Sequence, residues 1–130
     1  MLCPCGSKKL YLKCCEPFIS CRSTPTTPEE LMRSRYTAYT QANIEYIVRT
    51  MQGRALEGFD PVDAKEWAKG LKWLGLDVLN AYDLPEVGHA SVEFKAWYRF
   101  NARKHCLHEL SEFSFVNGRW YYIGMQDMPV

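Results

Sequence analysis

The sequence predicts one α+β domain, with helices packed on one face of a bent antiparallel sheet and a small cysteine-rich segment ahead of it. The chain has 130 residues, of which 47% are hydrophobic, enough for one core. Helical periodicity dominates to about residue 75, and alternation of apolar and polar residues follows. Helices first and a strand meander afterwards is the pattern of an α+β fold.

The first two predicted helices have recognisable ends. Thr27 is a good N-cap, Pro28 suits the first helical position, and Glu30 completes a capping box. A second, shorter helix is expected from Asn43, with Gly53 as its stop. The stretch before the first helix, residues 17–27, contains serine, threonine and proline and is interpreted as a linker.

The third predicted helix opens at Asp60, an N-cap followed by a proline. Trp67, Leu71 and Leu74 lie at positions i, i+4 and i+7, which gives the helix an apolar face. Gly75 is therefore expected to end it.

Strands are expected in the second half of the chain, joined by short turns. Alternation is clearest where Val92, Phe94 and Ala96 alternate with charged residues and Trp97. Residues 84–86 are the expected exit of the first strand, residues 101–104 form a turn, and Asn117-Gly118 is a strong two-residue hairpin signal. The expected strands are 76–82, 92–100, 105–116 and 119–124.

Two cysteine pairs near the start are the most specific chemical signal. Cys3 and Cys5 are separated by eight residues from Cys14 and Cys15. Four thiolates can close a tetrahedral zinc site, with iron as the rival metal. Disulfides are the alternative, and they require an oxidising compartment.

The residues between the pairs suit a metal. Gly6 permits a tight turn that aims backbone N–H groups at sulfur. A zinc ion with four thiolates carries two negative charges, which Lys8, Lys9 and Lys13 could offset. The apolar side chains available to shield the metal are Leu10 and Leu12.

Charge and hydropathy limit the partners and the compartment. The formal net charge is +1, so a nucleic-acid partner is not favoured. The sequence shows no signal peptide and no apolar run long enough to span a bilayer. A cytoplasmic location is expected, where thiols stay reduced and metal is favoured over disulfide.

The cysteine-rich segment resembles the SEC-C motif, the zinc-binding tail of the SecA translocation ATPase. Cys-Pro-Cys-Gly-Ser, Tyr11 and Cys14-Cys15 carry the likeness, although Lys8 stands where a second glycine is usual. The resemblance implies a SEC-C segment over residues 1–20 and one structural zinc. In SecA the motif contacts the chaperone SecB and ribosomes, so a protein or ribosomal partner is an expectation. The implied metal ligands are Cys3, Cys5, Cys14 and Cys15.

A second resemblance covers almost the whole chain. Residues 31–39, 73–76, 92–94 and 118–122 are similar to the YchJ-like proteins, which join a SEC-C motif to an NTF2-like domain. This implies an NTF2-like cone over residues 26–130, with three helices against a curved sheet and a cavity between them. The family has no assigned reaction. Its usual Glu-Arg-Ser-Arg-Phe run lacks both arginines here, at residues 109–113.

Strand alternation places Glu109 on the apolar face, with Leu107, Ser111, Phe113 and Phe115. A buried carboxylate must pair or protonate, and Arg35 on the first helix is the expected partner. The alternative is a general base with a raised pKa in a ligand pocket. No catalytic residue is assigned. The candidate pocket residues are Arg35, Tyr36, Tyr98 and Glu109.

The first functional hypothesis is therefore a zinc-binding interaction protein. Its SEC-C module would recognise a protein or ribosomal partner, and its NTF2-like domain would give a second binding or homodimer surface. Trp97, between Lys95 and Arg99, marks either such a surface or a ring beneath a loop. The alternative is an enzyme or small-molecule binder with its pocket in the cone and a purely structural zinc. Weak RNA binding through the basic N-terminal stretch is a third reading.

Overall fold

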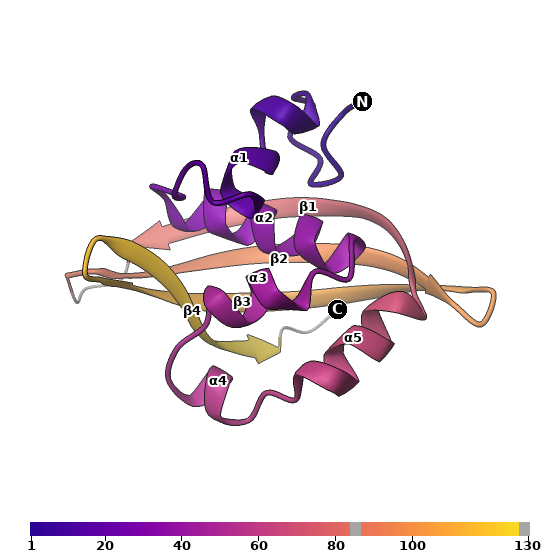
Figure 1. Cartoon of the computed structure of the whole chain (residues 1–130). Coiled ribbons are helices and arrows are strands. Elements are labelled where there is room, and N and C mark those ends of the chain that lie inside the picture. Colours follow the sequence, from indigo (N-terminus) through magenta and orange to yellow (C-terminus); the bar gives the residue numbers. More distant parts are fainter. Residues whose placement is uncertain (84–86, 128–130) are drawn as a thin grey trace.

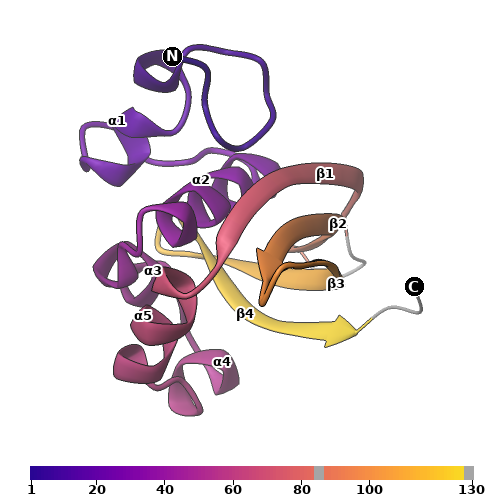
Figure 2. The ribbon, with the colours of Figure 1, turned by 90° about the vertical axis from the view of Figure 1, so that its right-hand side faces the viewer.

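The computed structural model describes residues 1–83 and 87–127, and these form the predicted α+β architecture (Figure 1). A four-stranded antiparallel meander has the strand order β1-β2-β3-β4. Figure 2 shows the helices on one side of the curved sheet. Register shifts at Val78/Asn80 and Glu112/Phe113 mark irregularities of the kind that bend a sheet. The strands are β1 Lys72–Asp83, β2 His89–Phe100, β3 Arg103–Val116 and β4 Arg119–Asp127.

The helix starts are those predicted. Thr27 Oγ1 accepts a hydrogen bond from Glu30 N at 3.1 Å, and the Glu30 carboxylate accepts one from Thr26 N at 2.8 Å. The capping box therefore closes one residue earlier than its usual form. Asn43 and Asp60 cap the next two long helices through their side-chain oxygens. The three helices are α2 Pro28–Thr40, α3 Ile44–Arg49 and α5 Pro61–Lys69.

The predicted end of the third helix is wrong. Helix α5 stops at Lys69, with Gly70 as its C-cap, and Leu71 and Leu74 lie outside it. Strand β1 begins at Lys72, because pairing with β2 satisfies this backbone better than another helical turn. The second helix also ends before its predicted stop, at Arg49.

Two short helices were not predicted. Helix α1, Glu16–Ile19, occupies part of the presumed linker, and α4, Arg54–Glu57, follows Gly53. Each helix is a single turn, and four residues are too few to show the helical spacing of apolar side chains. The backbone between α3 and α4 instead joins the sheet: Tyr122 N donates to Thr50 O at 2.8 Å.

Both described hairpin loops have two residues. Asn101 and Ala102 have φ of 51° and 62°, and Asn117 and Gly118 have φ of 51° and 82°. Positive φ at both positions is the geometry that matches the twist of antiparallel strands. The turn expected over 101–104 is thus shorter than predicted, and β3 starts at Arg103. The strand exit expected at 84–86 lies outside the described residues.

The core lies between α2 and the inner face of the sheet. Val92, Phe94 and Ala96 are buried, as their alternation predicts. Phe115 is exposed although it shares their pattern, because it lies near the end of β3. The same core cluster contains Cys3, Cys5, Cys15, Leu31, Met32, Tyr36 and Phe113. The cysteine-rich segment is therefore packed into the domain core and is not a loose appendage.

Helix lengths also bear on membranes. In the described part of the chain, the helices are too short or too polar to cross a bilayer.

Candidate metal centre

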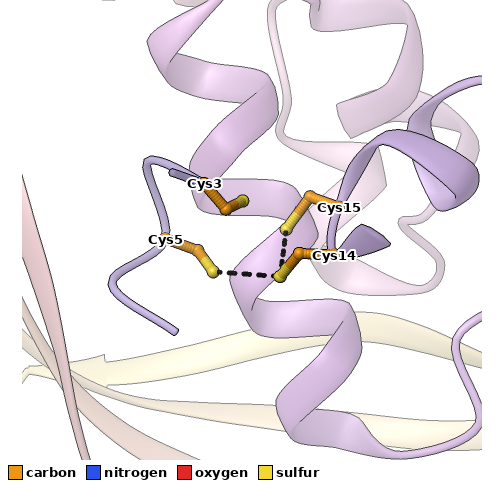
Figure 3. Close-up of side chains that lie close together, drawn as sticks. All are labelled: Cys3, Cys5, Cys14 and Cys15. Atoms are coloured by element: carbon orange, nitrogen blue, oxygen red, sulfur yellow. Dashed lines mark hydrogen bonds between the residues drawn. The ribbon is translucent and has the colours of Figure 1, made fainter. Parts of the chain in front are cut away.

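Four cysteine sulfurs meet beside helix α2 (Figure 3). Their Sγ atoms all lie within 4.8 Å of one another; Cys5 and Cys14 are 3.6 Å apart, and Cys14 and Cys15 are 3.9 Å apart. A tetrahedral zinc with Zn–S bonds of about 2.3 Å has S···S edges of roughly 3.8 Å. A disulfide would hold two sulfurs about 2.05 Å apart. The spacing therefore fits four ligands around one ion.

Local backbone structure brings the two pairs together. Cys3 N donates to Lys9 O at 2.8 Å, which folds the first ten residues back on themselves. A turn of 3-10 helix over Tyr11–Lys13 then delivers Cys14, whose N–H donates to Tyr11 O at 3.1 Å. Tyr11, one of the residues that carry the SEC-C likeness, accordingly supplies a backbone anchor for the second pair.

Gly6 lies where the segment meets the sheet. Its φ is +80°, and a Cβ added there would be 2.8 Å from Leu76 O on β1. Glycine is thus required both for the backbone conformation and for the close approach to the strand. The turn that carries Cys5 therefore lies directly against β1.

Polar groups surround the sulfurs. Ser7 Oγ is 3.1 Å from Cys14 Sγ, and the buried Thr37 hydroxyl is 3.7 Å from Cys3 Sγ. Arg33 Nη1 donates to Cys5 O at 2.7 Å. These residues from α2 and the cysteine loop can orient the ligands and offset negative charge.

Of the loop residues expected near the metal, only the leucines behave differently from the prediction. Lys8, Lys9 and Lys13 are exposed, and so are Leu10 and Leu12. The leucines do not shield the cluster, because α2 and the core already cover it on the inner side.

The thiols strongly influence one another. A hydrogen bond from Cys15 lowers the pKa of Cys5 to about 4, and the same contact raises the pKa of Cys15. Burial raises the pKa of Cys14. Among Cys5, Cys14 and Cys15, the metal-free cluster therefore favours deprotonation of Cys5 and opposes that of the other two. A divalent cation removes this conflict, because it stabilises deprotonated sulfur directly.

The donor set fits zinc, and iron shares the tetrahedral thiolate preference. Four protein ligands would leave no open coordination position, so the chemistry such an ion supplies is structural. Cys21 is exposed and Cys106 is half-buried, and neither belongs to the quartet.

Three of the four candidate pocket residues line one cavity of about 460 Å³ between the helices and the sheet: Arg35, Tyr36 and Glu109. Tyr98 does not line it, since its ring stacks on His105 at 5.2 Å and packs against two tryptophans. Burial raises the pKa of Tyr36 to about 12. The direct ion pair predicted between Arg35 and Glu109 is not among the contacts of Arg35 with described residues.

Arg35 bonds to the end of α3 instead. Its Nη1 donates to Ile47 O at 2.9 Å and to Thr50 Oγ1 at 2.7 Å, and its guanidinium lies 4.5 Å from the Tyr122 ring centre. Burial lowers the pKa of Arg35, and the charge of Glu109 acts in the opposite direction. The strand pattern identified Glu109 but not the aromatic wall, because the wall comes from four separate elements. Its members include Tyr39, Trp67, Trp73 and Tyr122.

Fold and site together define a class: a mixed α+β domain with a possible metal-binding cysteine cluster built into its N-terminal end. A family model described as "YchJ, middle NTF2-like domain" matches residues 27–124. A UPF0225 protein from Geobacter sulfurreducens is 43% identical over 122 residues, which cover 93% of this chain and 76% of the relative. This chain belongs to the YchJ-like, UPF0225 family.

Solved structures agree with this assignment. A SEC-C motif containing protein from Rhodopseudomonas palustris is 34% identical, with a TM-score of 0.89 and coverage of 99% of this chain and 100% of that one. A SEC-C motif containing protein from Psychrobacter arcticus is 30% identical, with a TM-score of 0.84 and coverage of 100% and 84%. The predicted combination of a SEC-C motif with an NTF2-like domain is confirmed.

Proposed function

We propose that this protein is a cytosolic zinc-binding interaction protein. Cys3, Cys5, Cys14 and Cys15 would hold one structural ion, and the SEC-C segment around them would recognise a protein partner. The spacing of the four sulfurs supports the metal, and the surface of the segment supports the partner.

The exposed apolar side chains of the SEC-C segment support the proposed recognition of a protein partner. Leu2, Leu10 and Leu12 are 60%, 51% and 69% exposed. Leu2 and Leu10 face each other across a β-bridge, and exposed lysines lie beside them in sequence. Apolar groups rimmed by charge are typical of protein interaction sites. We call this set, Leu2, Leu10, Leu12, Lys8, Lys9 and Lys13, the leucine–lysine surface.

A partner complementary to this surface would present apolar side chains ringed by carboxylates. The lysines would speed encounter and fix orientation, and the leucines would supply most of the buried apolar area. Since the quartet shapes this segment, binding is expected to require the metal.

Copurification from cells tests this function. We expect the Leu10→Ser/Leu12→Ser double variant to lose at least tenfold in recovery of the partner that the unchanged protein enriches. Leu79→Ser is the matched control, because Leu79 is similarly exposed but lies on β1. Quantitative mass spectrometry measures the recovery, with and without a strong chelator. Equal recovery by the double variant and the control would contradict the assignment of this surface. A partner lost only at raised salt or after nuclease treatment would indicate RNA instead.

The outer face of the sheet is the proposed second contact surface. Trp97 is half-buried there: its Nε1 donates to Asp77 Oδ2 at 2.9 Å, and Lys104 Nζ is 4.8 Å from its ring centre. Tryptophan beside charged groups is enriched at interfaces. We propose that two copies of the domain meet through this face.

Sedimentation equilibrium over a hundredfold range of concentration tests the dimer. We expect self-association in the unchanged protein and at least a tenfold weaker association in Trp97→Ala. Leu12→Ser, on the cysteine-rich segment and outside the sheet, serves as the surface control. A monomer at every concentration would rule out this second surface and leave the metal proposal intact.

A further inference from the structure

The cavity between α2 and the sheet has the dimensions of a ligand site. Its volume of about 460 Å³ falls within the range of small-molecule pockets. Helices α2, α4 and α5 and all four strands contribute to its wall, so it is a property of the whole fold. Arg54, Trp67 and Met125 are partly exposed and therefore lie at its opening.

The apolar wall is mostly aromatic. Trp67 and Trp73 meet edge to face with ring centres 5.4 Å apart, and Tyr36 contacts Trp73 at 5.6 Å. Rings fixed against one another in this way form a preformed surface that a flat molecule can contact without reordering side chains. The wall therefore favours a planar, apolar body.

One charged residue faces this wall with unused donors. Arg35 is only 5% exposed and lines the cavity, and its Nη1 serves both Ile47 O and Thr50 Oγ1. Among the residues that the structure describes, none accepts a hydrogen bond from Nε or Nη2. Arg35 Nε and Nη2 are not among the fully buried side-chain atoms that lack a partner in the described part of the chain, so these donors reach the open space of the cavity. The guanidinium can thus donate a hydrogen bond to a ligand oxygen.

Ionisable groups of both signs border the cavity. Arg35 and Glu109 are both buried and line it, and Glu109 acts to raise the pKa of Arg35. Arg54 at the opening lies 3.7 Å from the Glu112 carboxylate. An ion entering this space would add an uncompensated charge in a region of low dielectric, which is costly. A guest without net charge avoids that cost.

We propose that the cavity binds a small, flat molecule of no net charge, with an aromatic body against the tryptophans and an amide-like carbonyl oxygen that accepts from Arg35. This site is separate from the metal centre, and its occupant is independent of the protein partner. The cavity would recognise this molecule in two ways. The aromatic rings would select its flat shape, and the opposite charges of Arg35 and Glu109 would select against a net charge.

Three probes of nearly equal size test both kinds of selection on the full, metal-loaded chain: 2-naphthamide, 2-naphthoate and 2-methylnaphthalene. Titrations are followed by the indole N–H signals in two-dimensional NMR. We expect saturable binding of the amide and at least tenfold weaker binding of the carboxylate and the hydrocarbon. Failure of the amide to bind, or equal or tighter binding of either other probe, would overturn the proposal.

Glu109→Gln changes the charge balance without changing side-chain size. In this variant the carboxylate should gain at least tenfold relative to the amide, because Arg35 then lacks its acidic counterpart. An unchanged ratio would show that Glu109 does not set the charge preference, and the proposal would be wrong.

A second variant locates the probe even if Glu109→Gln fails to fold. Ala55→Trp would fill the cavity from α4, whereas Leu56→Trp places the same final side chain at an adjacent residue outside the lining. We expect the first to abolish amide binding and the second to retain it. Undiminished binding by Ala55→Trp would place the probe elsewhere.

Discussion

Stripping the metal from the reduced protein is expected to lower its melting temperature by about 10 °C or more. The four sulfurs belong to the same core as Leu31 and Phe113, so their separation would loosen the domain itself. A loss of about 3 kcal/mol corresponds to a shift of this size in a domain of this length. Calorimetry before and after chelation measures the shift, and readdition of zinc should reverse it.

Two cysteine variants make this test specific to the quartet. Cys14→Ser removes a ligand, and Cys21→Ser removes a thiol that lies outside the cluster. Elemental analysis should find one equivalent of metal in the second variant and far less in the first. Well under one equivalent in the unchanged, reduced protein, with all four thiols reacting freely with an alkylating agent, would refute the metal site.

Replacing Gly6 with alanine is expected to destabilise the protein by about 2–5 kcal/mol and to weaken metal binding. A side chain at φ of +80° costs about 1–2 kcal/mol. The added Cβ, 2.8 Å from Leu76 O, must also push the loop away from β1, at a cost of about 1–3 kcal/mol. That movement would displace the Cys5 thiolate from its neighbours. Urea denaturation and competition with a chelating dye measure the two effects.

Lys8→Gly is the matched control in the same loop. Lys8 has φ of 68°, which explains why a second glycine suits this position in SEC-C motifs. Glycine there should leave stability equal or raise it by up to about 1 kcal/mol, because relief of strain is partly offset by entropy of the unfolded chain. If Gly6→Ala and Lys8→Gly behaved alike, the contact with Leu76 would not matter.

The sequence predicted the cluster of four cysteines well because its geometry is local. Cys3, Cys5, Cys14 and Cys15 lie within fifteen residues, so short hydrogen bonds suffice to bring them together. The same holds for the helix caps at Thr27 and for the hairpin at residues 117–118. In each case the deciding contacts lie a few residues apart.

Other features depended on contacts between distant parts of the chain. Leu71 and Leu74 fit a helical stripe, but Gly70 ends α5 and the pairing of β1 with β2 takes the following residues. Arg35 was predicted to form an ion pair with Glu109 only because the two side chains have opposite charges. The carbonyl of Ile47 and the hydroxyl of Thr50 bind it instead, because α3 ends beside it. No periodic pattern encodes such a contact.

Helix α2 contributes to both sites: Thr37 touches a cysteine sulfur, while Arg35 and Tyr36 line the cavity. These three residues are consecutive in α2, so a displacement of this turn on metal binding would reach both sites. Thermodynamic reciprocity then requires that any effect of the ion on a guest's affinity be matched by an equal effect of the guest on the ion.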